Sequence, residues 1–215
     1  MEIRPASDRS LLVSCGEGIS LETHGQVKRL LRACESVPPG ILNLHPAYAS
    51  VLIDFDPRRW THTAVEEWVS ERLAAAESTA APEGRTVEIP VQYGGEFGPD
   101  LEDVARHTGL APDEVVRRHA AERYLVYFVG FSPGFPYLGG MPPELATPRL
   151  AAPRKRVPAG SVAIGGSQTG IYSVESPGGW RIIGRTGLRL FDPQAIPPAL
   201  VGAGDSVRLV PQAAL

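Results

Sequence analysis

The chain has 215 residues, of which 43% are hydrophobic and 21% are charged, enough for one sizeable hydrophobic core or two small ones. Its formal net charge of −3 gives no basic footprint for nucleic acid. No apolar run reaches about 18 residues, and the first residues lack the apolar stretch of a signal peptide, so we expect a soluble, cytoplasmic protein.

The first part of the chain alternates between strand-like and helix-like segments. Their patterns predict strands at 11–15, 41–45, 51–55 and 86–91 and helices at 20–35 and from residue 63 onward. Residues 2–4 leave room for an extra strand, and Thr63 to Glu66 form a predicted capping box. Because the order β-α-β-β-α-β is that of a ferredoxin-like unit, we predict a small ferredoxin-like α/β domain at residues 1–84.

A second domain is predicted at residues 85–215. Residues 74–85 are small and polar and include Pro82 and Gly84, which is typical of a linker. The pattern then predicts helices at 101–107 and 112–121 and short strands at 124–129, 161–164, 180–183, 188–191 and 206–210. Short strands broken by glycine and proline favour a barrel or sandwich, so the whole chain is predicted to be α+β.

Residues 130–140, GFSPGFPYLGG, combine four glycines and two prolines with large apolar side chains. This composition predicts a loop of fixed shape, because glycine frees the backbone and proline removes a donor. The first five residues fit the G-x-S-x-G elbow of α/β-hydrolases, in which the residue after the serine donates its N–H to an oxyanion. Here that residue is Pro133, which has no N–H, so we predict Ser132 to be a turn residue.

Several other chemistries lack their motifs. No Gly-Lys dipeptide and no complete G-x-G-x-x-G is present, so any use of ATP does not involve a P-loop or a Rossmann fingerprint. The five histidines have no metal-like spacing and are predicted to be surface or cap residues, and no metal site is predicted. Cys15 and Cys34 are predicted to be unpaired thiols.

The glycine- and proline-rich segments of the second domain together resemble one known family. They are residues 130–140, 154–161, 165–170 and 176–180, preceded by 91–100 and followed by 183–186. In this order the segments resemble the family of the 5-oxoprolinase B subunit, which includes the KipI kinase inhibitor and allophanate hydrolase subunit 1. The resemblance covers essentially the whole second domain and, through residues 46–48 and 54–57, extends more loosely to the first.

The resemblance implies a cyclophilin-like β-barrel at residues 85–215 and a place in a larger assembly. It implies that two further proteins, a homologous C subunit and an A subunit, act with this chain to open 5-oxo-L-proline to L-glutamate. ATP, with Mg²⁺ and shared with a partner, would phosphorylate the lactam oxygen before hydrolysis. Two other roles remain open: an inhibitor that binds a sensor histidine kinase, and a component of the allophanate hydrolase or urea carboxylase type.

Under the oxoprolinase interpretation the site residues fall into two sets. The predicted catalytic residues are Arg154, Lys155, Arg156 and Gln168. The predicted substrate-binding residues are Phe131, Phe135, Tyr137, Thr169, Tyr172, Ser176 and Trp180. Arginine suits a phosphate or carboxylate because its fork binds both oxygens. Each set also has a simpler interpretation. The basic run at 154–156 can be a solvated surface, and Gln168 and Thr169 can be ordinary turn residues. The aromatic residues can contact the C subunit instead of a substrate.

Overall fold

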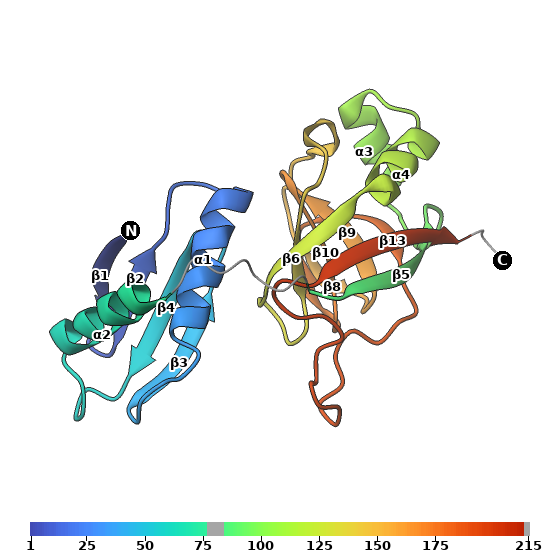
Figure 1. Ribbon diagram of the computed structural model, residues 1–215. Helices are drawn as coiled ribbons and strands as arrows, with labels where there is room; N and C mark the ends of the chain where they lie inside the picture. Colours follow the sequence, from blue (N-terminus) through green and yellow to red (C-terminus); the bar gives the residue numbers. More distant parts are fainter. Residues whose placement is uncertain (77–83, 213–215) are drawn as a thin grey trace. The chain divides into compact units, whose positions relative to one another are not determined.

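The computed structural model describes residues 1–76 and 84–212 and divides into two compact units, Met1–Pro82 and Glu83–Leu215 (Figure 1). Most of the predicted linker at 74–85 lies outside the described residues, although Ala74 and Ala75 end a helix. None of the helices in the described ranges is long and apolar enough to cross a membrane.

The first unit is a four-stranded antiparallel sheet covered by two helices. Its elements are β1 (Glu2–Ser7), β2 (Ser10–Ser14), α1 (Leu21–Ala33), β3 (Ile41–Pro46), β4 (Ser50–Phe55) and α2 (His62–Ala75). The strand order is β1-β2-β4-β3, and both helices lie on one face, where they contact each other and the sheet (Figure 1). Phe55, Val65 and Val69 are fully buried in the core between these layers, as alternation on β4 and the apolar stripe of α2 require.

The predicted ferredoxin-like order of this unit is not confirmed. Its order is β-β-α-β-β-α, because the fourth strand is the N-terminal β1, and the predicted last strand at 86–91 pairs within the second unit instead. Alternating apolar residues identify a strand but not its partner, which the tertiary fold selects. The capping box was also misplaced: α2 begins after Thr61, whose side chain accepts a hydrogen bond from the N–H of Ala64 at 3.2 Å.

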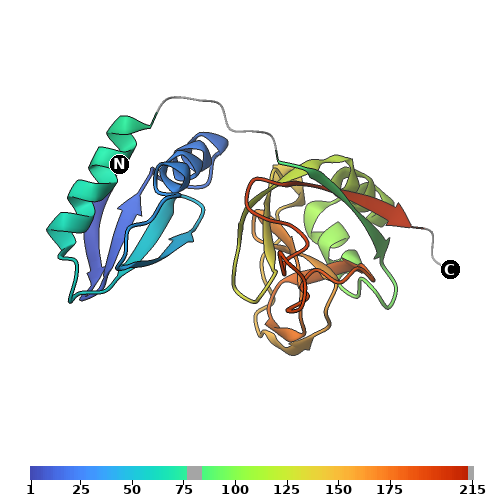
Figure 2. The same cartoon turned by 60° about the horizontal axis from the view of Figure 1, so that its bottom comes forward.

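The second unit is built on a closed seven-stranded barrel. Its elements are β5 (Thr86–Tyr93), α3 (Leu101–Thr108), α4 (Pro112–Ala121), β6 (Arg123–Val129), β7 (Pro136–Gly139), the 3₁₀ turn η1 (Pro143–Leu145), β8 (Arg154–Val157), β9 (Ser161–Gly165), β10 (Gln168–Ile171), β11 (Ser176–Gly178), β12 (Arg181–Arg185) and β13 (Ser206–Gln212). The barrel order is β10-β7-β6-β13-β5-β12-β9. The neighbouring strands β5 and β13 run parallel (Figure 2), and the other pairs are antiparallel. This closed barrel is consistent with the cyclophilin-like fold that the resemblance implies.

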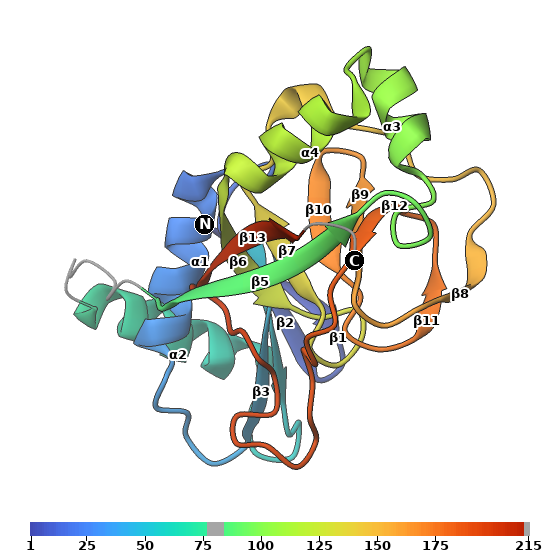
Figure 3. The same cartoon turned by 90° about the vertical axis from the view of Figure 1, so that its right-hand side faces the viewer.

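Two additions surround the barrel (Figure 3). The helices α3 and α4 pack against β12 and β13, and Gly109 ends α3 in the left-handed conformation with φ 71°. The strands β8 and β11 pair only with each other and form a two-stranded ribbon outside the barrel. The ribbon carries the basic run Arg154 to Arg156, and it leads directly into the segment before β12.

Glycine and proline were a poor guide to the strands of this unit. The glycine- and proline-rich segments at 130–140, 154–161, 165–170 and 176–180 contain β7, β8, most of β10 and β11, respectively. Conversely, the predicted strand at 188–191 is not formed, and only an isolated bridge joins Phe191 to Ala199. A glycine weakens a strand in general, but it is favoured where another group must approach the strand closely.

Candidate functional site

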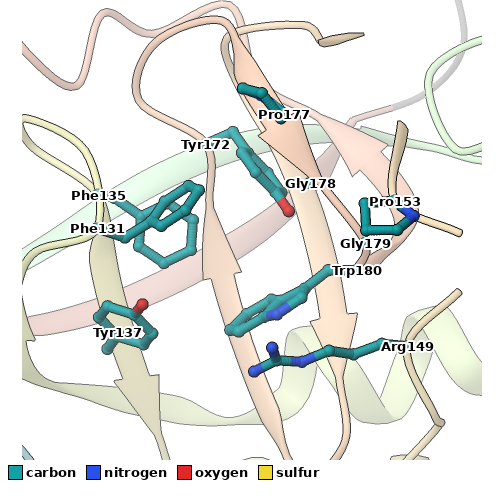
Figure 4. Close-up of a pocket in the computed structure, with 10 residues that line it drawn as sticks. All are labelled: Phe131, Phe135, Tyr137, Arg149, Pro153, Tyr172, Pro177, Gly178, Gly179 and Trp180. Atoms are coloured by element: carbon teal, nitrogen blue, oxygen red, sulfur yellow. The ribbon is translucent and has the colours of Figure 1, made fainter. Parts of the chain in front are cut away.

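An open pocket of about 270 Å³ lies in the second unit beside the β8–β11 ribbon (Figure 4). It is lined by Phe131, Phe135, Tyr137, Arg149, Pro153, Tyr172, Pro177, Gly178, Gly179 and Trp180. All five aromatic residues predicted to bind substrate are among them. The structure therefore collects rings from the 130–140 segment, from the end of β10 and from the start of β12 around one cavity.

Phe135 lies at the centre of this aromatic cluster and is 2% exposed. Its ring makes edge-to-face contacts with Tyr137, Tyr172 and Trp180, at centroid distances of 4.9, 5.4 and 5.7 Å. Such arrangements add about 0.5–1.5 kcal/mol per pair to the burial of the rings. The floor of the pocket is therefore packed before any ligand binds.

Three glycines make room for these rings. At each of them an added Cβ would lie only 2.2 to 2.8 Å from the nearest atom of an aromatic side chain, closer than real Cβ contacts allow. The three pairs are Gly165 with Trp180, Gly170 with Phe135, and Gly178 with Tyr172. These glycines lie in strands, and their function is to let the rings rest against the strand backbone.

Phe131 forms the rim of the pocket, where it is 62% exposed and contacts Phe135 at a centroid distance of 5.5 Å. Its φ of 65° is in the left-handed region, which is unfavourable for a bulky residue. The turn is closed by a 3.0 Å hydrogen bond from the N–H of Gly130 to the carbonyl of Phe135. Backbone strain of this kind is concentrated at functional sites, which supports a binding role for this rim.

Tyr172 closes the inner end of the pocket, and its hydroxyl points toward Gly178 (Figure 4). Burial raises the pKa of Tyr172, while a hydrogen bond from the backbone N–H of Trp180 and the positive charge of Arg149 act in the opposite direction. The side chain therefore stays protonated at neutral pH and can both donate and accept hydrogen bonds.

Arg149 is the cation of the pocket, and no pattern in the sequence predicted it. Its guanidinium carbon lies 5.7 Å from the centre of the Trp180 ring, a cation–π contact of about 0.5–1 kcal/mol at an exposed site. Figure 4 shows the side chain running beside that ring into the pocket. Arg149 belongs to no sequence motif, and its position beside Trp180 is a tertiary contact that only the structure reveals.

The basic run does not line the pocket. Arg154 donates to Asp100 at 2.7 Å, and the other carboxylate oxygen of Asp100 accepts from the N–H of Ile182 at 2.7 Å. Arg156 pairs with Glu175 at 2.8 Å on the surface. Lys155 is exposed and has no ion pair within residues 1–76 and 84–212. The three cations are therefore not gathered around one anion, and Arg154 ties the ribbon to α3 and β12.

The remaining predicted residues lie elsewhere. Gln168 begins β10 opposite Gly165 and is not among the residues that line the pocket. Ser176 lies in β11, and its hydroxyl is buried without a hydrogen-bond partner in the described part of the chain. Thr169 is fully buried in the barrel, so it is not available to a substrate, contrary to the prediction.

The Thr169 hydroxyl belongs to a buried chain of hydrogen bonds. It donates to the carbonyl of Ala163 at 3.0 Å and accepts from Nε2 of His119 at 2.9 Å. Because a neutral imidazole has one donor and one acceptor nitrogen, Nδ1 of His119 accepts from the Tyr93 hydroxyl at 2.9 Å. Burial lowers the pKa of His119 to about 3. His119 is thus a neutral core residue and not the surface or cap residue predicted, and the same correction applies to the buried His24.

A second pocket of about 440 Å³ lies on the same unit and has a more polar lining, which includes Gln92, Arg185 and Arg189. Both arginines already have partners, because Arg185 donates to the carbonyl of Ala159 at 3.1 Å and Arg189 to Asp192 at 3.2 Å. None of the predicted site residues lines this pocket. The aromatic pocket is therefore the stronger candidate site.

The chain matches known proteins along most of its length. The family described as "Carboxyltransferase domain, subdomain C and D" matches residues 1–201. The 5-oxoprolinase B subunit of Bacillus subtilis is 43% identical, over 97% of this chain and 92% of that protein. The chain belongs to the 5-oxoprolinase B-subunit family. A second member, from Haemophilus influenzae, is 41% identical over 98% of this chain and 97% of its own length.

A solved structure supports the fold assignment for this member of the 5-oxoprolinase B-subunit family. The crystal structure of TTHA0988 superimposes with a TM-score of 0.85 and 38% sequence identity over 96% of this chain. The match covers 40% of the TTHA0988 chain, so this chain spans less than half of that protein. The curated names do not favour the kinase-inhibitor and allophanate hydrolase alternatives.

Proposed function

We propose that this chain is the B subunit of an ATP-dependent 5-oxoprolinase, which opens 5-oxo-L-proline to L-glutamate together with the A and C subunits. The observation that carries the proposal is the end-to-end match to the 5-oxoprolinase B subunit of Bacillus subtilis, at 43% identity. Because the relatives are named as one subunit, other subunits must complete the enzyme, and we propose that the A and C subunits are these partners. We also propose that this chain alone does not catalyse the reaction.

The aromatic pocket suits the substrate of that reaction. 5-Oxoproline is a small five-membered lactam with a carboxylate, and an open cavity of about 270 Å³ can hold such a ring against Phe135 and Trp180. Apolar walls with a few polar groups are typical of small-molecule sites. We therefore propose that this chain binds and orients the lactam, with Phe131 and Tyr137 at the sides of the pocket and Tyr172 at its inner end.

The reaction needs activation of the lactam, because amide resonance makes its carbonyl a poor target for water. Phosphorylation of the lactam oxygen by ATP would supply a good leaving group, and a protein assists such a step by positioning and charge neutralisation. The predicted basic run does not form a ready nucleotide site, because Arg154 and Arg156 are already paired with carboxylates. No group of three or more metal-ligating side chains is found among the described residues of this chain either. We propose that ATP and Mg²⁺ are held mainly by a partner protein of the complex.

Reconstitution tests the proposal. The purified chain is mixed with the A and C subunits, and glutamate release from 5-oxoproline is measured with and without ATP. We expect turnover only when all three subunits and ATP are present. Unchanged turnover after omission of this chain would contradict the proposal.

The basic run can be tested in the same assay. Lys155 has no ion pair in the described residues, so it is the member of the run that is free to contact an anion at an interface within the complex. We expect Lys155→Ala to lower turnover while the complex stays assembled, as checked by size-exclusion chromatography. If the rate is unchanged, the run is only a solvated surface.

A further inference from the structure

We infer that Arg149 binds the carboxylate of a small cyclic acid whose ring lies against Trp180 in the aromatic pocket. This inference rests on the proposed function, because it assigns the orientation of the lactam at that same site. It adds a specificity-determining residue that no sequence motif indicates.

The guanidinium of Arg149 is free to bind an anion. It contacts the face of Trp180 through the cation–π interaction, and its N–H groups donate no hydrogen bond to any other residue that the structure describes. No carboxylate pairs with it within residues 1–76 and 84–212. The neighbouring cations differ, because Arg154 is paired with Asp100 and Arg181 with Asp103.

The backbone around Arg149 is held in place by hydrogen bonds of its neighbours in the chain. Thr147 exchanges two backbone hydrogen bonds with Gly166, at 2.8 and 3.1 Å, and Leu150 donates to the carbonyl of Gly179 at 2.7 Å. The side chain of Arg181 also donates to the carbonyl of Pro148 at 3.3 Å. The segment around Arg149 is thus anchored on both sides, so less conformational entropy is lost when a ligand binds.

Charge and polarity are unevenly distributed around the aromatic pocket. No acidic side chain is among the described residues that line the pocket, and its other members are aromatic residues, prolines and glycines. Arg149 is therefore an unbalanced positive charge at the edge of an apolar cavity (Figure 4). A ligand complementary to this arrangement has an apolar ring and one negative group, and the planar fork of arginine matches a carboxylate with two parallel hydrogen bonds.

The test uses the three-subunit complex and the variants Arg149→Gln and Arg149→Lys. We expect Arg149→Gln to raise the KM for 5-oxoproline about 10- to 100-fold, the range for loss of hydrogen bonds to a charged group, with a much smaller change in kcat. Arg149→Lys keeps the charge but not the fork, so its KM is expected to lie between those of Arg149→Gln and the wild type. The control is Arg106→Gln, which removes an exposed arginine of α3 with the same change in charge and should leave KM unchanged.

A neutral lactam distinguishes the contribution of the carboxylate to binding from that of the ring. 2-Pyrrolidinone has the lactam ring without the carboxylate, so we expect it to inhibit the wild type and Arg149→Gln with equal inhibition constants. A KM for 5-oxoproline that does not change in Arg149→Gln would overturn the inference while the proposed function stands.

Binding of 5-oxoproline to the purified chain distinguishes failure of this inference from failure of the proposed function. The Trp180 indole N–H signal, assigned by its loss in Trp180→Phe, is followed by NMR as 5-oxoproline is added. If the complete complex releases no glutamate, the proposed function fails, yet a saturable shift that is weakened in Arg149→Gln still supports the inference. If the complex is inactive and the wild-type signal does not move, both proposals are contradicted.

Discussion

Arg149 and Arg154 lie close together in the sequence, in the same glycine- and proline-rich half of the chain, but they differ in their partners. Arg154 donates to Asp100, whose side chain is 5% exposed and is also held by the backbone of β12. Arg149 has no carboxylate partner in the described part of the chain and lies on Trp180. Arg154 stabilises the fold, whereas Arg149 is available to a ligand.

This difference shows why residue type alone is a poor guide to function. A charge that is paired inside the protein is already balanced by its partner, and separating the two carries a desolvation cost. A fixed but unpaired charge keeps its donors for a ligand. Variants of the Arg154–Asp100 pair should therefore change mainly the stability of the fold, and variants of Arg149 should change mainly ligand binding.

The largest expected effect is on the stability of the second unit in Asp100→Ala. Loss of the carboxylate leaves the guanidinium of Arg154 and the N–H of Ile182 without their acceptor, and we expect the free energy of unfolding to fall by about 3 kcal/mol. Urea unfolding followed by tryptophan fluorescence measures it. Asp103→Ala is the control, because that carboxylate is 42% exposed and each of its ion pairs is worth no more than about 1 kcal/mol. Equal losses in the two variants would remove the distinction between a structural pair and a surface pair.

Gly165→Ala should affect both stability and the pocket. The added Cβ would lie 2.5 Å from the Trp180 ring, so the ring must move, and we expect a loss of about 1–3 kcal/mol in the free energy of unfolding. A changed near-ultraviolet circular dichroism spectrum would report the moved ring. The control is Gly25→Ala in α1, where a Cβ meets nothing within 4 Å and the gain in helix propensity should stabilise the first unit by up to about 1 kcal/mol. An unchanged spectrum and stability in Gly165→Ala would contradict the account of the pocket floor.

The buried His119 should make the stability of the second unit depend on pH. Its pKa is lowered to about 3 in the folded state, so below about pH 6.5 the unfolded chain takes up a proton that the folded chain does not. Stability should therefore fall as the pH falls from about 6.5 toward 3, with a slope that approaches about 1.4 kcal/mol per pH unit once the histidine of the unfolded chain is mostly protonated. Urea unfolding at several pH values measures the slope. In His119→Gln the slope should decrease by that amount, and an identical slope would contradict the buried neutral state.

The smallest effect on stability is expected for Arg149→Gln. The side chain is exposed and has no ion pair among the described residues, so only the cation–π contact with Trp180 is lost and the free energy of unfolding should fall by no more than about 1 kcal/mol. Thermal unfolding by calorimetry measures it. A loss similar to that of Asp100→Ala would mean that Arg149 has a structural role.

Local patterns were enough to predict many elements of the fold. The helices at 101–107 and 112–121 were confirmed within a residue, because an apolar stripe and a proline in the first turn act over short distances. The partner of β5 was not predictable in this way. Its alternating Val87, Ile89 and Val91 fit the edge of a small sheet as well as a barrel wall, and the choice depends on β13, far along the chain.

The site was partly predictable for a similar reason. The rings of the 130–140 segment stood out because a loop that carries exposed aromatic residues is typical of binding sites. The glycines at 165, 170 and 178 belong to the segments that carry the family resemblance, but the sequence does not show that each one makes room for an aromatic ring. Thr169 was predicted to bind the substrate, but it is fully buried in β10, where its neighbour Gly170 packs against Phe135.

The most direct test of the central claim is a structure of the three-subunit complex with 5-oxoproline and a non-hydrolysable ATP analogue. We predict that the lactam ring lies between Phe135 and Trp180 and that its carboxylate is within hydrogen-bond distance of the Arg149 guanidinium. A lactam bound entirely by another protein of the complex, with the aromatic pocket of this chain empty, would contradict the account.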